Sequence, residues 1–221
     1  MCGRFTLAIE PEELQAEFQI PDLPAEWHQR YNIAPTQPVA AILDARQRQI
    51  EFLRWGLIPS WAKDISIGAR MINAREESLA EKPSFRSAFA KRRCLIVTDG
   101  YFEWKKDTKG PSTPYRFTLK NNKPFAFAGL WESWRNPEGG ELKSCTIITC
   151  AANEMALSIH NRMPVILPRE KYWGWLEETD PEVLKSFLIP YPSKFMIASQ
   201  VGRIVNNALI DTPECILPVA A

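Results

Sequence analysis

Short apolar stretches, separated by breaks that contain Pro, Gly or Asn, run through the middle of the chain. They are rich in β-branched and aromatic residues, which fit a pleated, half-buried surface and therefore predict strands. The predicted strands comprise residues 38–44, 49–56, 94–98, 101–104, 115–119, 124–131, 144–151 and 194–199. The first two flank a charged turn and predict a hairpin. The strands at 115–119 and 124–131, joined around Asn121 and Asn122, predict a second one.

Periodic apolar positions predict short helices around this strand-rich middle. Leu14 and Phe18 are spaced by four residues, as on one face of a helix, and acidic residues precede them. Near the other end, Asp180 is expected to cap a helix that has Pro181 at its first position. The helices are predicted at residues 10–20, 153–158, 169–176 and 181–188, with a further helical region after residues 70–77.

The predicted elements do not alternate as regular βαβ units, and no internal repeat or linker divides them. They predict an α+β fold with a largely antiparallel, barrel-like sheet and short peripheral helices, in one domain spanning residues 1–221. Residues 55–61 are apolar but broken by Gly and Pro, which predicts a loop that exposes or half-buries its aromatic side chains. Alternation along strand 101–104 places Glu103 opposite Phe102 and Trp104. Glu103 is then either a buried polar group or the solvent-facing member of an edge strand.

Composition narrows the classes of function. The formal net charge of the 221 residues is +1, so a nucleic-acid site would have to be a local patch. No apolar run approaches the ~20 residues of a membrane span, and no secretory signal pattern opens the sequence, which together predict a cytoplasmic protein without a membrane partner. Five cysteines without a Cys-x-x-Cys pair favour a reducing compartment and predict neither disulfides nor a metal site. No cofactor is expected.

Cys2 is the first candidate for chemistry. Once Met1 is removed, this residue carries an α-amine and a thiol on adjacent carbons, with ordinary pKa values of about 7.7–8.0 and about 8.5. An aldehyde that meets the pair is attacked by the amine to give an imine, and the thiolate then closes a five-membered thiazolidine. Gly3 permits close approach, and Arg4 offers a fixed charge to an anionic substrate. A cysteine at this position is also often incidental.

Other polar residues lie within apolar surroundings and have alternative structural explanations. Asn32 and Asn73 are of the type that braces loops through side-chain to backbone hydrogen bonds. His160 follows a predicted helix, where a cation interacts favourably with the helix dipole. Taken together, the candidate residues are Cys2, Arg4, Asn32, Asn73, Arg75, Glu103, His160, Arg162 and Asn206.

The motifs that contain these residues resemble those of the SRAP family, the SOS response-associated peptidases or abasic site processing proteins. In order, they are Met-Cys-Gly-Arg-Phe, Tyr-Asn-Ile-Ala-Pro, Trp-Gly-Leu-Ile-Pro, Ile-Asn-Ala-Arg-x-Glu, Gly-Tyr-Phe-Glu-Trp-Lys and Ile-His-Asn-Arg-Met-Pro. The resemblance extends from Cys2 to about Asn206. The tail departs from the family, because Ala-Ser-Gln-Val-Gly-Arg-Ile-Val-Asn stands where a Pro-Val-Ser-type stretch is common.

The resemblance implies a DNA-damage function. Family members bind single-stranded DNA and link their N-terminal cysteine covalently to the ring-opened aldehyde of an abasic site, which shields the lesion from strand cleavage. For this chain it implies Cys2 as nucleophile through amine and thiol, and Glu103 as general acid and base. His160 would be a second proton donor that also takes part in reversal, and Asn73 would hold the amine or a sugar hydroxyl in place.

The same resemblance implies a DNA surface. Arg4, Arg75 and Arg162 are expected to bind phosphates through their guanidinium forks. Asn32 belongs to the same expected surface, and Trp61 would stack on, or wedge between, bases beside the lesion. The expected partner is single-stranded DNA with abasic sites, including DNA at replication forks, bound by a monomer.

Two other classes of function remain open at the level of sequence. A Cys2-dependent peptidase or autopeptidase would use Glu103 and His160 as base partners, although only Met1 precedes Cys2 as a leader. A lyase-type activity would accompany an imine that is not trapped by the thiol. A non-covalent binder of single strands would treat intact and abasic DNA alike and would not depend on Cys2.

Overall fold

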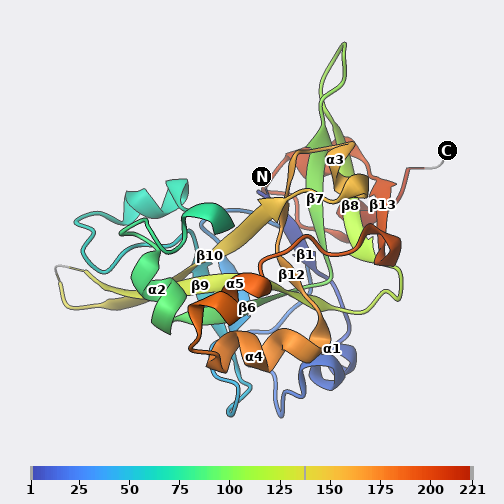
Figure 1. The fold of residues 1–221 in the computed structure, drawn as a ribbon. Coiled ribbons are helices and arrows are strands. Elements are labelled where there is room, and N and C mark those ends of the chain that lie inside the picture. Colours follow the sequence, from blue (N-terminus) through green and yellow to red (C-terminus); the bar gives the residue numbers. More distant parts are fainter. Residues whose placement is uncertain (1, 137, 220–221) are drawn as a thin grey trace.

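A ring of five strands forms the centre of the protein, in a computed structural model that describes residues 2–136 and 138–219 (Figure 1). Strand β3 pairs with β4 and β6, β6 with β9, and β9 with β10, all antiparallel. A parallel pairing of β10 with β4 closes the ring. The five strands are β3 (Pro38–Ile42), β4 (Ile50–Trp55), β6 (Arg93–Thr98), β9 (Phe125–Arg135) and β10 (Glu141–Ala151).

Three short strands extend the barrel sheet at its rim. Both β5 and β11 pair with the last part of β10, so that Thr149 lies opposite Arg75, and Ala151 opposite Arg162. Strand β12 pairs with β9. Their bounds are β5 (Asn73–Arg75), β11 (Arg162–Pro164) and β12 (Ile166–Leu167). Residues far apart in sequence therefore meet around the end of β10.

A second, five-stranded antiparallel sheet packs against the barrel. Its strand order is β13-β8-β7-β1-β2. Phe5 of β1 contacts Trp55 edge-on at 5.0 Å between ring centroids, and Tyr101 of β7 stacks on Phe117 at 4.8 Å. These rings are completely buried and join the two sheets into one apolar core. The strands are β1 (Phe5–Leu7), β2 (Arg30–Ile33), β7 (Gly100–Lys105), β8 (Thr113–Leu119) and β13 (Met196–Gln200).

Short helices lie on the periphery of the sheets (Figure 1). Helix α4 packs on β6, where the indole of Trp175 donates a hydrogen bond to the carbonyl of Cys94 at 3.1 Å. Asp180 caps α5 as predicted, accepting from the amide of Glu182. The α-helices are α1 (Pro11–Phe18), α2 (Arg86–Lys91), α3 (Glu154–Leu157), α4 (Tyr172–Glu177) and α5 (Pro181–Ser186). The 3-10 helices are η1 (Ile65–Arg70), η2 (Glu76–Ser78), η3 (Arg169–Lys171), η4 (Ser193–Phe195), η5 (Arg203–Asn206) and η6 (Pro213–Ile216).

This architecture confirms the predicted α+β class, the barrel and the peripheral helices, and the register of β3 with β4 confirms the first hairpin. The second predicted hairpin is wrong, because β8 pairs with β7 and β13 while β9 pairs with barrel strands. Between them the chain crosses from one sheet to the other through a turn at Asn122, whose φ of 55° is in the left-handed region that asparagine tolerates.

Three further segments differ from the sequence prediction in detail. Residues 73–75 form β5 instead of leading directly into a helix, because β10 offers them a free edge. Residues 203–206, in a part of the tail for which the sequence indicates strand and loop, form η5. Trp55 ends β4 and is completely buried, whereas Trp61 in the loop that follows is 59% exposed. Within the described residues, no helix has the length and apolar character needed to cross a membrane.

Candidate functional site

The site residues gather where β1 begins, β7 ends and β5 meets β10. Cys2 lies just before β1 and is completely buried. Its carbonyl oxygen accepts a hydrogen bond of 2.7 Å from the side-chain amide of Asn73 in β5. This bond fixes the backbone of Cys2 against the barrel rim. Met1, whose removal the proposed chemistry requires, lies outside the described residues.

The electrostatics of Cys2 hold its thiol in the neutral form. Burial raises the pKa of the Cys2 thiol well above its ordinary value, and the nearby Glu103 carboxylate raises it further. The thiol therefore keeps its proton at neutral pH until a reaction changes its surroundings.

Glu103 is buried rather than solvent-facing, because β7 is an interior strand between β1 and β8. Only 5% of the residue is exposed, which excludes the edge-strand explanation of its position. Burial raises the pKa of Glu103 from 4.5 to about 7. A carboxyl group with this pKa exists in both protonation states near neutral pH and can therefore donate or accept a proton.

His160 follows α3 and is anchored at two points. Asn153 caps α3 by accepting from the amide of Ala156 at 2.9 Å, and the amide of His160 donates to the carbonyl of Ala156 at 2.8 Å. The Nδ1 atom of His160 lies 3.0 Å from the amide nitrogen of Arg162 and 3.1 Å from its carbonyl oxygen, so the backbone of Arg162 holds the ring in either tautomer. Burial lowers the pKa of His160, and the charges of Lys106 and Arg162 lower it further, which keeps the imidazole neutral at pH 7.

The half-buried Arg4 and the buried Asn32 form a pair behind the site. The Arg4 guanidinium donates to the side-chain oxygen of Asn32 and to the carbonyl of Val205, both at 2.7 Å, and lies 5.8 Å from the ring centroid of Trp104. Asn32 is completely buried, and its amide nitrogen donates to backbone carbonyls of the C-terminal segment, including that of Ile210 at 2.6 Å. Asn32 thus faces Arg4 and the tail, so any effect on DNA would pass through the orientation of Arg4.

Arg75 and Arg162 flank the end of β10 from opposite sides, on β5 and β11. Arg162 forms two hydrogen bonds with the carboxylate of Glu77 and one of 2.6 Å with the carbonyl of Thr149. The Arg162 guanidinium lowers the pKa of Glu77, and the charge of Arg75 contributes. The Glu77 carboxylate therefore accepts hydrogen bonds from Arg162 donors that could equally bind a phosphate oxygen.

Sequence reasoning named the members of this site but not three of its neighbours. The hydroxyl of Tyr101 is buried without a hydrogen-bond partner among the described residues, and burial, with Cys2 as the next cause, raises its pKa. Trp104 donates to the side-chain oxygen of Asn206 at 2.7 Å. Tyr101 and Trp104 stand in the Gly-Tyr-Phe-Glu-Trp-Lys motif, and Glu77 ends Ile-Asn-Ala-Arg-x-Glu, so the motifs already carried the signal.

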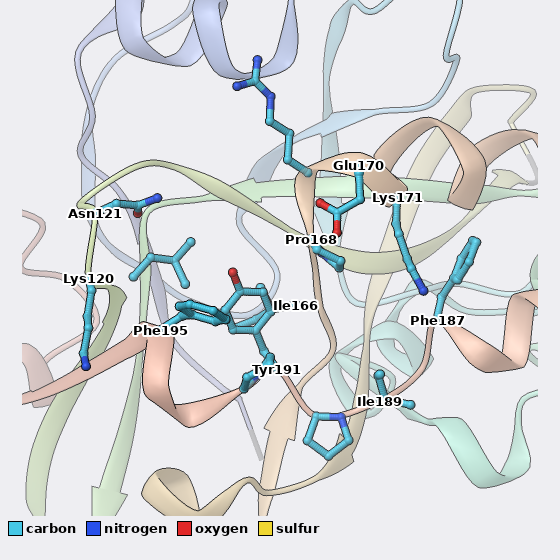
Figure 2. Close-up of a pocket in the computed structure, with 14 residues that line it drawn as sticks. Lys120, Asn121, Ile166, Pro168, Glu170, Lys171, Phe187, Ile189, Tyr191 and Phe195 are labelled. Carbon is cyan, nitrogen blue, oxygen red and sulfur yellow. The ribbon is translucent and has the colours of Figure 1, made fainter.

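A separate cavity of about 590 Å³ lies between the end of β8, β12 and residues 187–195 (Figure 2). Apolar side chains such as Ile189, Tyr191 and Phe195 line it together with Lys120 and Lys171. None of the ten predicted site residues lines this cavity. The predicted site and this cavity are therefore separate places on the molecule.

Comparisons with known proteins agree on one family. The profile of the "SOS response associated peptidase (SRAP)" family matches residues 1–208. The chain is 48% identical to "Abasic site processing protein YoqW" of Bacillus subtilis (strain 168), over 98% of this chain and 99% of the relative. It is 28% identical to "Abasic site processing protein HMCES" of Pongo abelii, over 99% of this chain and 76% of the relative.

Solved structures share the fold. A crystal structure of a protein from Bacteroides thetaiotaomicron superposes with a TM-score of 0.89 at 24% identity, covering 99% of this chain and 100% of that one. Another, from Bordetella bronchiseptica, gives a TM-score of 0.79 at 28% identity over 91% of this chain and 100% of that one.

Proposed function

The chain belongs to the SOS response associated peptidase (SRAP) family, and we propose that it processes abasic sites in single-stranded DNA by forming a covalent thiazolidine through Cys2. The observation that carries this proposal is the convergence of three groups at the N-terminal end of β1. These groups are the Cys2 thiol, the Asn73 amide on the Cys2 carbonyl, and the Glu103 carboxyl with a pKa of about 7.

The first stage joins the amine of Cys2 to the aldehyde carbon of the ring-opened sugar, after removal of Met1. The nitrogen adds to the carbonyl carbon, and the resulting carbinolamine loses water to become an imine. The neutral form of Glu103 donates the proton that the leaving hydroxyl requires, and its ionised form receives one from the ammonium nitrogen. Asn73 holds the Cys2 backbone, so the amine attacks from a fixed position.

The second stage closes the ring. The sulfur of Cys2 adds to the imine carbon, and the thiol proton is transferred to the nitrogen. The products of the whole reaction are the thiazolidine and the water molecule released in the first stage. An imine withdraws electrons and promotes β-elimination, which breaks the strand. Ring closure removes the imine and thereby protects the DNA. His160, neutral at pH 7, supplies a second proton donor near the sugar oxygen.

Arg75 and Arg162 bind phosphates beside the lesion in this proposal, with Glu77 exchanged for a phosphate oxygen at Arg162. Trp61, exposed on its loop, stacks on a flanking base. The proposed setting is cytoplasmic DNA damage, including single strands at replication forks, with the protein acting as a monomer. A single Cys2 active site requires no second subunit.

The test is intact-mass spectrometry before and after incubation with a single-stranded oligonucleotide that carries one abasic site. We expect the protein without Met1 to gain the mass of the oligonucleotide less one water, in a heat-stable adduct that Cys2→Ala abolishes. Cys2→Ser retains the amine, so it should cleave the strand without a stable adduct. An unchanged stable adduct in Cys2→Ser would refute the thiazolidine.

A thiol peptidase is the second candidate because the family description contains that activity. A peptidase nucleophile requires a thiolate, whereas burial and Glu103 hold the Cys2 thiol protonated. The amine-first route needs no thiolate at the start and therefore fits the site better. Turnover of an unrelated peptide that is lost in Cys2→Ala would favour the peptidase instead.

A further inference from the structure

The β7–β8 hairpin projects from the body of the protein on the side where the site lies (Figure 1). Strand β7 ends at Lys105 and β8 begins at Thr113, and these two residues pair with each other. Lys105, Lys106 and Lys109 are exposed on this hairpin. The one carboxylate of residues 105–113, Asp107, accepts a hydrogen bond of 2.7 Å from the Thr113 hydroxyl. The hairpin therefore has an excess of positive charge that its own residues do not neutralise.

The hairpin continues the strand that carries the acid–base group of the site. Lys105 lies two residues after Glu103 and so projects from the same face of β7. The charge of Lys106 reaches His160, whose pKa it lowers. Lys106 and Lys109 follow Glu103 by three and six residues, which sets their greatest separation from it at about 10 Å and about 20 Å along the chain.

The C-terminal segment braces this hairpin. Arg203 of η5 donates to the carbonyl of Pro111 at 3.4 Å. The same short helix accepts a hydrogen bond from Trp104 at Asn206 and one from Arg4 at Val205. Helix η5 thus connects the hairpin, the exposed Arg203 and Arg4. These contacts hold the base of the hairpin in a defined position beside the site.

We propose that the β7–β8 hairpin binds backbone phosphates of the DNA strand through Lys106 and Lys109, a few nucleotides from the lesion held at Cys2. Lysine acts on phosphate as a point charge and needs no fixed fork geometry, which suits an exposed loop. At about 3.4 Å per nucleotide in a stacked strand, a reach of about 10–20 Å corresponds to roughly three to six nucleotides. The proposal rests on the function proposed above, since it takes the strand to pass through the Cys2 site.

The experiment compares the salt dependence of binding between three variants that share one intact, fluorescein-labelled single strand. Lys106→Ala with Lys109→Ala removes the two hairpin charges. Lys120→Ala with Lys123→Ala removes two exposed charges beyond the opposite end of β8 and is the matched control. Lys106→Arg with Lys109→Arg keeps the hairpin charge. Anisotropy titrations between about 50 and 200 mM salt give the slope of log K against log salt for each.

The hairpin alanine pair should lower the steepness of this slope by about 1.4, since each phosphate contact to a single strand contributes about 0.7. The control pair and the arginine pair should keep the wild-type slope. Equal slopes for the hairpin and control alanine pairs would overturn the proposal and leave the hairpin a solvated loop. Because the strand is intact, this result does not depend on whether Cys2 forms an adduct.

A second arm separates binding from chemistry. A trinucleotide with the abasic site in the middle is too short to reach Lys109, so wild type and Lys109→Ala, which leaves the charge of Lys106 beside His160 in place, should form the adduct at the same rate. A long abasic strand at sub-saturating concentration should react more slowly with Lys109→Ala than with wild type. An equally slow reaction of Lys109→Ala on the trinucleotide would place this lysine in the chemistry and contradict the proposal. An absence of adduct in the wild type would refute the proposed function alone.

Discussion

Glu103→Gln should make the protein more stable at alkaline pH while it slows adduct formation. Glutamine has the shape of the neutral carboxylic acid and removes only the charge. The folded state raises the pKa of Glu103 from 4.5 to about 7 through burial, so folding disfavours the ionised form. The wild type therefore loses stability as the pH rises from about 4.5 to about 7, and the loss is complete above that window.

The size of the effect follows from these two pKa values. At about 1.4 kcal/mol for each pH unit between them, the ionised Glu103 costs about 3 kcal/mol of unfolding free energy. Urea denaturation of wild type and Glu103→Gln should therefore coincide near pH 4.5 and separate by up to about 3 kcal/mol at pH 8. For a chain of this length, the melting temperatures would differ by roughly 6–12 °C at pH 8.

The control is Glu81→Gln, which removes the same charge from an exposed turn. It should leave the pH dependence of stability unchanged. The rate of adduct formation, followed by gel shift, should fall by roughly 10²–10⁴-fold in Glu103→Gln, as for the loss of a general acid–base group. A separation between wild type and Glu103→Gln that is constant with pH would refute the assignment of a buried carboxyl titrating near neutrality.

Substitutions at three other positions probe the rest of the site. Asn73→Ala leaves the buried Cys2 carbonyl without its donor, so it should cost about 1–3 kcal/mol in thermal unfolding and slow the adduct, whereas Asn73→Asp, which cannot donate, should not rescue it. Trp61→Ala should weaken binding of a single strand by about 1–3 kcal/mol in anisotropy titrations without changing the melting temperature, and a stability loss instead would indicate a packing role. The folded state lowers the pKa of His160, so wild-type stability should fall as the pH drops below about 6.5, and His160→Gln should lack this fall. Melting temperatures of wild type and His160→Gln that change in parallel with pH would contradict this.

Local pattern predicted most strands of this fold but only one of their pairings correctly. The β3–β4 hairpin followed from two strands and a charged turn, and the structure has it. The strands at 115–119 and 124–131 gave the same signal, yet β8 and β9 belong to different sheets. A turn of a few residues fits a hairpin and a crossing between packed sheets equally well, because the choice depends on apolar faces formed by distant strands. The parallel closure of β10 on β4 is likewise invisible to local sequence.

The site was predicted through its motifs rather than through geometry. Alternation along β7 placed Glu103 on one face but could not show whether that face was buried, since the answer depends on how segments distant in sequence pack around β7. Asn32 came from the same kind of motif, and the structure places it behind Arg4. Motifs do not show burial or orientation. They show which residues belong together but not which of them face a ligand.

Burial of the site also orders the steps of the proposed reaction. A surface thiol would compete with the amine for the aldehyde from the start, whereas burial and the charge of Glu103 keep the Cys2 thiol neutral until the imine has formed. The positive charge that develops on the protonated imine favours loss of the thiol proton, and the Glu103 carboxyl, with a pKa of about 7, is in a position to accept it. Glu103 thus acts as an acid while water leaves and as a base while sulfur adds. Both roles require a pKa near the working pH. Burial of Glu103 provides this pKa, and the same burial lowers the stability of the folded protein when Glu103 is ionised.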